Sequence, residues 1–254
     1  MNISNFSSDT WQITKRNLIH YKRSPRLIFF SVIQPVIFVL LFAYVFGGAI
    51  NVPGNSYINF LIPAIIIQTV LFGAVNTAVG LSEDMSKGLM DRFRSLPMNR
   101  AAVIAGRTLA DSLRNISTVL IMIGVGYAID FRIEQSLPET IGAVMLAVLF
   151  GFAIMWVMTI IGLSVKKSET AQMAGMAFIF PLTFASSAFV PTASMPDGLQ
   201  WFAQHSPVTY AIDTLRGLMI TGNYNDTIWY MLAWITGILI IAFPLAVRQY
   251  KKIG

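Results

Sequence analysis

The sequence contains no cysteine and little charge. Because its 254 residues include no Cys, it can form no disulfide framework, thiolate metal site or catalytic thiol. Only 12% of the residues are charged, about half the share typical of soluble domains, whereas 55% are hydrophobic. A soluble domain of this length would lack the solvated groups to cover its surface. The composition therefore indicates a membrane protein.

Motifs for nucleotide and metal chemistry are also missing. There is no G-x-x-x-x-G-K-[ST] phosphate loop and no G-x-G-x-x-G fingerprint. The two histidines, His20 and His205, have no partner at metal-ligand spacing, so a zinc site or a His-based triad has no support. We expect a non-catalytic chain that binds no cofactor or metal itself.

Long stretches without charge define the expected fold. A membrane-spanning helix needs roughly 20 apolar residues. The charge-free stretch 27–82 holds two such helices, divided by the turn-forming cluster 51–56. We predict an all-α membrane protein whose single transmembrane domain, 1–254, contains six spans. The expected spans cover residues 28–50, 57–80, 109–129, 140–165, 170–190 and 227–247.

Basic residues are concentrated in alternate connections. Sixteen of the 18 Lys and Arg residues lie on one side of the predicted membrane, which places both termini in the cytoplasm. The inner side then carries a net charge of +10 and the outer side −4. These basic groups flank membrane helices and form no nucleic-acid-binding motif, so we expect no nucleic-acid partner. The expected location is the plasma membrane, with lipids as neighbours.

Two segments combine charge with apolar residues near the inner side. Residues 6–26 interleave aromatic and apolar side chains with five basic residues, which predicts an interfacial helix; a plain basic flank is the alternative. The third span must begin near Leu109 to be long enough. This brings Arg107, Asp111 and Arg114 onto one helix face. We expect them either to anchor that helix at the interface or to brace the cytoplasmic end of the bundle as an ion pair.

The connection between the second and third spans contains a charged amphipathic segment, residues 83–97. Its apolar residues recur at spacings of three and four, which predicts a short helix ending before Pro97. A loop that only connects two spans needs no apolar stripe, whereas an element that docks onto a partner protein does.

Prolines interrupt the connection between the fifth and sixth spans. Its two moderately apolar pieces are each too short to cross a membrane. We predict two short helices within 197–222, broken at Ser206-Pro207, that dip back from the outer face; a surface loop with two amphipathic helices is the alternative. Asp213 and Arg216 are three residues apart and could form an exposed ion pair or part of a gate.

The predicted spans carry no Asp, Glu, Lys or Arg near their middle. This disfavours proton-coupled transport and ion conduction. The fifth span is rich in Met and Phe, which suits either a path for hydrophobic molecules or a lipid-facing helix. Polar residues within the spans suit interhelical hydrogen bonds as well as ligand contacts. The candidate path residues are Gln68, Asn76, Met176, Phe180 and Phe184.

Two segments of the chain resemble signatures of the ABC-2 type permeases, and most of all those of the daunorubicin/doxorubicin-resistance subgroup. The first runs from Glu83 through Gly88-Leu89-Met90-Asp91-Arg92-Phe93-Arg94-Ser95-Leu96-Pro97 to Gly106-Arg107 and resembles the family's coupling-helix segment. The second runs from Phe189-Val190-Pro191 through Ser206-Pro207-Val208-Thr209-Tyr210 to Arg216.

The resemblance implies the membrane half of an ATP-driven exporter. Two permease subunits, forming a homodimer rather than a heterodimer, enclose the path, and two copies of a separate cytoplasmic ATPase bind ATP and Mg. The implied cargo is a hydrophobic or amphipathic drug or lipid; a polysaccharide or lipid-linked glycan is an alternative, as is a non-transport scaffold or sensor subunit.

The resemblance also implies roles for individual residues. The implied ATPase-coupling residues are Glu83, Asp84, Gly88, Leu89, Asp91, Arg92, Phe93, Arg94, Leu96 and Pro97. The implied external-gate residues are Pro207, Tyr210, Asp213 and Arg216.

Overall fold

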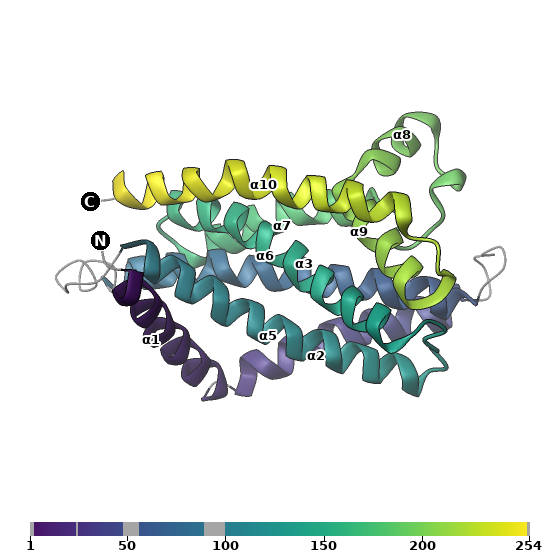
Figure 1. Ribbon diagram of the computed structural model, residues 1–254, viewed down its shortest axis with the longest axis horizontal. Helices are drawn as coiled ribbons and strands as arrows, with labels where there is room; N and C mark the ends of the chain where they lie inside the picture. Colours follow the sequence, from purple (N-terminus) through teal and green to yellow (C-terminus); the bar gives the residue numbers. More distant parts are fainter. Residues whose placement is uncertain (1–2, 24, 48–55, 89–99, 253–254) are drawn as a thin grey trace.

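The computed structural model describes residues 3–23, 25–47, 56–88 and 100–252, and the regular structure in that part of the chain is helical throughout. The long helices lie along the long axis of the molecule and alternate in direction (Figure 1). They are α2 (Pro25–Leu41), α3 (Tyr57–Ser86), α5 (Arg100–Ala128), α6 (Leu137–Ser164), α7 (Ser168–Phe184) and α10 (Asn225–Lys252). Both chain termini lie at one end of this bundle, which we call the terminal end (Figure 1).

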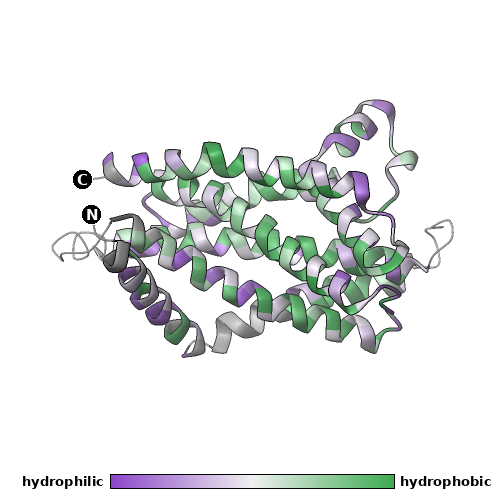
Figure 2. Ribbon diagram, in the orientation of Figure 1, coloured by the Kyte–Doolittle hydropathy of each residue, from purple (hydrophilic) through white to green (hydrophobic). Residues whose placement is uncertain are grey.

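Several of these helices suit a membrane. Four are long and apolar enough to cross one: α3, α6, residues Ala105–Ala128 of α5 and residues Asn225–Tyr250 of α10. Helix α2 has 17 residues and continues into a π-helical turn, η1 (Phe42–Phe46), while α7 also has 17 residues. Apolar residues cover the middle of the bundle and polar residues gather at its ends (Figure 2). The chain is thus a multi-pass membrane protein, and the count of six spans stays a prediction.

Two helices extend further than the predicted spans. Helix α5 begins at Arg100 rather than near Leu109, and Arg107 in the added turns pairs with Asp84 of α3. Helix α3 continues through Glu83 to Ser86, so residues 83–86 belong to α3 and do not start a separate helix. Gly88 follows with a φ of +65°, a left-handed conformation that commonly ends helices.

Helix α3 is the centre of the bundle. In its most apolar window 83% of the residues are buried, against 22% in α10. It packs against α5, α6 and α7. The approach to α6 is close, because a Cβ on Gly162 would lie 2.7 Å from the carbonyl oxygen of Ala78. Small residues therefore set the spacing of these two helices.

Shorter helices cover the two ends. At the terminal end, α1 (Ile3–Lys22) packs on α5, and the buried Thr14 hydroxyl donates a hydrogen bond to the Gly106 carbonyl at 3.0 Å. The opposite end, which we call the α9 end, carries the remaining short helices (Figure 1). These are η2 (Thr192–Ser194), α8 (Asp197–His205), α9 (Pro207–Arg216) and η3 (Gly217–Thr221). The positions of α1, α8 and α9 relative to a bilayer stay predictions.

Candidate functional site

A cavity of about 550 Å³ opens between α1, α2, α3, α5 and α7, toward the terminal end. This volume lies within the range of small-molecule sites, roughly 300–1,000 Å³. Its wall includes four cationic and two anionic side chains, those of Arg16, Lys87, Arg107, Arg114, Glu83 and Asp84. Pro35, Phe72 and Met176 supply an apolar part of the same wall. The cavity therefore combines the two kinds of surface that an amphipathic molecule needs.

The predicted path residues divide around this cavity. Asn76 and Met176 line it, whereas Gln68 lines a small neighbouring pocket that shares Thr69 and Phe72 with the cavity. The Gln68 side chain is buried, and neither of its polar atoms has a hydrogen-bond partner among the described residues. Contact between these residues and a transported molecule stays a prediction.

An ion pair between α3 and α5 forms part of the cavity wall. The Arg107 guanidinium donates to the Asp84 carboxylate, which also lies 3.7 Å from a guanidinium nitrogen of Arg16 on α1. Gly80 makes room for this pair, because a Cβ there would lie 1.7 Å from Nη2 of Arg107. Three helices are thus held together beside the end of α3, where the predicted coupling segment begins.

Three of the predicted coupling residues lie within the described part of the chain. Glu83 and Asp84 lie in the last turns of α3, and Gly88 lies just beyond its end. Glu83 forms an exposed pair with Lys87, with 3.6 Å between the charged atoms. Leu89, Asp91, Arg92, Phe93, Arg94, Leu96 and Pro97 lie outside the described residues.

A second polar group, the Asp111 cluster, is buried behind the cavity. The Asp111 side chain is fully buried and accepts hydrogen bonds from the Tyr21 hydroxyl and, at 2.5 Å, from the Thr77 hydroxyl. Arg114 lies 3.6 Å from the same carboxylate and donates to the Gly73 carbonyl at 2.9 Å. Burial, and then the nearby Asp111 carboxylate, raise the pKa of Tyr21, so its hydroxyl stays protonated as a donor.

The Asp111 cluster answers one of the questions that the sequence left open. Asp111 pairs with Arg114, whereas Arg107 pairs with Asp84, so the three charges on α5 do not form one ladder. Because Asp111 also binds α1 and α3, it braces the bundle and does not act as a simple interfacial anchor. Sequence reasoning missed Tyr21 and Thr77, which lie 90 and 34 residues from Asp111 and give no local signal.

A row of phenylalanine rings, the phenylalanine ladder, begins at the cavity with Phe72 and ends with Phe38, which lines the small neighbouring pocket together with Phe72. Adjacent rings have centroids 4.3 to 6.0 Å apart. In order they are Phe72, Phe180, Phe184, Phe189, Phe42 and Phe38. Phe72 lines the cavity, and Phe180 and Phe184 are 41% and 45% exposed. Phe180 and Phe184, two of the predicted path residues, thus belong to a longer aromatic row, whose other members were not predicted as path residues.

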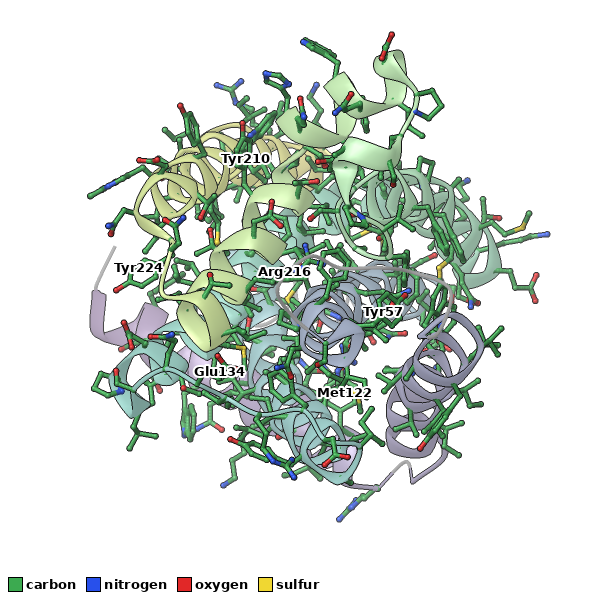
Figure 3. The ribbon with its side chains drawn as sticks, turned by 90° about the vertical axis from the view of Figure 1, so that its right-hand side faces the viewer. Tyr57, Met122, Glu134, Tyr210, Arg216 and Tyr224 are labelled. Carbon is green, nitrogen blue, oxygen red and sulfur yellow. The ribbon has the colours of Figure 1, made fainter. Side chains whose placement is uncertain are left out.

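At the α9 end, Arg216 holds three segments together in the Arg216 cluster. Its Nε donates to the Phe60 carbonyl at 3.0 Å, its Nη1 to Asp213 at 2.9 Å, and its Nη2 to the Ser187 carbonyl at 2.7 Å. Figure 3 shows the molecule from this end, and the Arg216 label lies near the centre of the view with Tyr57 beside it. Burial lowers the pKa of Arg216 to about 10, against the opposing effect of Asp213, so the side chain is still a cation at neutral pH.

The other predicted gate residues support the same region. Pro207 starts α9, and the Ser206 hydroxyl accepts a hydrogen bond from the Val208 amide at 3.3 Å. Tyr210 stacks on Tyr230 of α10, with 4.9 Å between the ring centroids. The Arg216 side chain is only 12% exposed, so its pair with Asp213 is not a fully exposed one. Whether this region opens and closes stays a prediction.

Comparisons with known proteins identify the family of the chain. The family model described as "ABC-2 type transporter" matches residues 8–220. The daunorubicin resistance ABC transporter permease protein DrrB1 of Streptomyces coeruleorubidus is 30% identical over 238 residues, covering 93% of this chain and 84% of the relative. The probable doxorubicin resistance ABC transporter permease protein DrrC of Mycobacterium tuberculosis is 30% identical over 245 residues, covering 95% of this chain and 88% of the relative.

A more distant relative is the inner membrane transport permease YadH of Escherichia coli, 21% identical over 193 residues, covering 73% of this chain and 74% of the relative. The family match covers most of the chain, and the relatives align over most of their own length. The chain therefore belongs to the ABC-2 type transporter family, as a membrane permease of an ABC transporter.

Proposed function

We propose that this permease exports hydrophobic or amphipathic molecules, such as drugs or lipids, across the plasma membrane. The observation that carries the proposal is the continuity between the cavity and the phenylalanine ladder, which share Phe72. An amphipathic molecule can enter a cavity that is partly charged and partly apolar, and then pass along aromatic rings that offer adaptable contacts. The names of the drug-resistance relatives support the same class of cargo.

The orientation of the proposed path follows from the charge asymmetry. The basic residues of the terminal end support a cytoplasmic location for that end. The cavity then faces the cytoplasmic leaflet, and the Arg216 cluster lies toward the outer side, where it closes the path. Two copies of the chain enclose the path between them, which covers the half-exposed rings of Phe180 and Phe184.

The energy for transport comes from a partner in this proposal. Permeases of this family generally work with a cytoplasmic ATPase, and the sequence contains no phosphate loop. ATP and Mg therefore bind two ATPase subunits, which dock onto the segment 83–97. The ion pair between Asp84 and Arg107 supports this part, because it ties the start of that segment to α5.

The path is tested by shortening rings of the ladder and measuring doxorubicin transport into inside-out vesicles that contain the permease and its ATPase. Phe180→Ala removes contacts with Phe72 and Phe184. Because an aromatic pair contributes about 1 kcal/mol, we expect transport to fall about fivefold. Phe178 is the matched control, since it lies on the same helix, is equally exposed at 41%, and is outside the ladder. Equal transport by the Phe180→Ala and Phe178→Ala variants contradicts the proposed path.

The docking role is tested separately by reversing charge in the coupling segment. Asp91→Arg and Arg92→Glu should each weaken co-purification of the ATPase and lower transport, because mixed charges fix the register of an interface. Insertion of the permease into the membrane should not change. Unaltered co-purification together with unaltered transport contradicts docking through this segment.

A further inference from the structure

Two segments at the terminal end carry exposed cations. One is the loop between α6 and α7, and the other is the C-terminal part of α10. The side-chain amide of Gln249 donates a hydrogen bond to the Ser164 hydroxyl at 2.7 Å, which joins the end of α10 to the end of α6 beside this loop. We call the exposed cations of the two segments the α10 patch. They are Lys166, Lys167, Arg248 and Lys252.

The α10 patch differs from the cations around the cavity in its lack of ion-pair partners. Arg107 of the cavity wall, for example, pairs with Asp84. No ion pair among the described residues includes a member of the α10 patch. The acidic residue nearest to the loop in sequence is Glu169, and counting it leaves four positive charges against one negative, a net charge of +3. The charge of this surface is therefore available to an external anion.

The face of α10 that carries two of these cations becomes apolar toward the middle of the bundle. Ile241, Leu245, Arg248 and Lys252 follow one another at spacings of four, three and four, so they lie on one helix face. Ile241 and Leu245 are 63% and 46% exposed. Figure 2 shows α10 changing from hydrophobic to hydrophilic toward its C-terminal end. One exposed face thus combines apolar and cationic side chains in sequence.

The length of α10 places this change at the edge of a bilayer. Residues 227–247 carry no charge, and the rise along the helix from Asp226 to Arg248 is about 33 Å. The hydrocarbon core of a bilayer is about 30 Å thick. When α10 crosses the membrane, Arg248 therefore lies at the level of the lipid headgroups, and Ile241 and Leu245 lie beside acyl chains.

A phospholipid fits this face better than a protein in the cytoplasm does. A cytoplasmic protein could pair with the cations, but it would leave Ile241 and Leu245 uncovered. A phospholipid covers both parts, because its phosphate meets the cations and its chain lies along the apolar residues. Guanidinium and ammonium groups bind phosphate well, and clusters of basic residues beside a span attract anionic lipids.

We propose that the α10 patch binds the headgroups of anionic phospholipids in the leaflet at the terminal end, with an acyl chain along Ile241 and Leu245. These lipids are not cargo, because neither α6 nor α10 contributes a residue to the cavity. Among the four candidate spans α10 has the smallest buried share, 22%, so little protein holds it in place. A bound headgroup links its end to the loop between α6 and α7. The inference goes beyond the proposed function and does not depend on what is exported.

Binding is measured by native mass spectrometry on the purified permease in detergent, with an equal mixture of two lipids. Dioleoyl phosphatidylglycerol is anionic and dioleoyl phosphatidylcholine is zwitterionic, and their chains are identical, so any preference reports the headgroup. We expect phosphatidylglycerol to be retained at least fivefold more than phosphatidylcholine. We also expect glycerophosphoglycerol, the same headgroup without chains, not to displace it. Equal retention of the two lipids, or displacement by the chain-free headgroup, overturns the proposal.

Variants connect the preference to the α10 patch. Arg248→Gln and Lys166→Gln should each lower the retention of phosphatidylglycerol about fivefold, as expected for one basic residue near an anionic surface, and leave phosphatidylcholine unchanged. Both residues are exposed, so neither substitution should prevent folding. Lys87→Gln is the matched control, because Lys87 is exposed at the same end but pairs with Glu83. An unchanged preference in both patch variants, or an equal loss in the control, overturns the site.

Co-purification of the ATPase separates a lipid site from a second docking surface. Permease with all four patch cations replaced by Gln should retain the ATPase as well as the parent does and should lose the preference for phosphatidylglycerol. Loss of the ATPase together with an unchanged lipid preference shows that the patch binds a protein, and it overturns the proposal.

Discussion

The Cζ atom of Arg216 lies 3.5 Å from the centroid of the Phe60 ring, and its Nε donates to the Phe60 carbonyl at 3.0 Å. One guanidinium thus contacts both the ring and the backbone of a residue 156 positions away in the sequence. A cation over an aromatic ring is favourable, more so when the pair is shielded from water. This contact holds α9 against the start of α3, so the stability of the α9 end should depend on Arg216.

Replacing Arg216 should destabilise the α9 end. Arg216→Gln removes the charge and most of the hydrogen bonds, and we expect the free energy of unfolding to fall by about 3 kcal/mol. Asp213→Asn should cost about 1 kcal/mol, because Asp213 is more exposed and makes fewer contacts. Arg216→Lys should resemble the glutamine variant, because an ammonium cannot reproduce the fork of donors. Thermal unfolding in detergent ranks the stabilities of the variants. A larger loss of stability from Asp213→Asn than from Arg216→Gln contradicts the prediction.

Substitutions of Asp111 and Arg114 should have coupled effects on stability, because the two side chains form a buried ion pair. Asp111→Ala leaves Arg114 without its carboxylate, so we expect unfolding to become easier by about 3 kcal/mol. Arg114→Met in the same chain should restore part of this loss, because the uncompensated buried charge is gone. Unfolding of the two single variants and the double variant in mixed micelles gives the coupling energy. Strict additivity of the two substitutions argues against a coupled buried pair.

Gly80 should control the ion pair beside the coupling segment. In Gly80→Ala the new Cβ would lie 1.7 Å from Nη2 of Arg107, so the guanidinium must move away from Asp84. Because this end of a long side chain is flexible, we expect little loss of stability but less transport per ATP hydrolysed. Asp84→Asn should have the same effect, and the double variant should be no worse than either single one.

The matched control for this experiment is Gly124→Ala on α5, where a Cβ would meet nothing within 4 Å. It should leave transport per ATP unchanged. Full coupling in Gly80→Ala, or an additive loss in the double variant, is incompatible with a role for the pair in transmission.

Two glycines of α6 should respond in opposite ways to the same substitution. Gly162→Ala places a Cβ 2.7 Å from the Ala78 carbonyl oxygen and 2.9 Å from the Ala78 Cα, both backbone atoms. Since α3 and α6 must separate, we expect a loss of roughly 1–3 kcal/mol. Gly142→Ala meets nothing within 4 Å and should stabilise the helix by up to about 1 kcal/mol. Thermal unfolding of both variants decides the point, and a stabilising Gly162→Ala would show that the helices are not in close contact.

The long helices were predictable because each needs only local information. Charge-free stretches mark the helices α3 and α6, and the turn cluster between the first two predicted spans is visible in the sequence. The ends of α3 and α5 were less predictable. Asp84 and Arg107 neutralise each other's charge between the two helices. Nothing in the sequence around either residue indicates which residue it pairs with.

The candidate site was predictable only in part. Arg216 and Asp213 were found because they are three residues apart on one helix, but Phe60 and Ser187 come from other segments. Gln68 was visible as a polar residue within a span, yet its lack of a partner among the described residues is a property of the packed bundle. Cavities and ring rows arise from several helices at once, so no single stretch of sequence encodes them.

Helix α3 contains 30 residues, about 45 Å of continuous helix, and it carries Asp84 near one tip and Phe60 near the other. A displacement of the tip beside Gly88 would therefore move the same helix that carries the contact with Arg216 at its other end. Pro63 has no amide hydrogen, so the turn that holds Tyr57 and Phe60 is the natural place for this helix to tilt. The two ends of the molecule are linked mechanically by one element, without a relay of separate contacts.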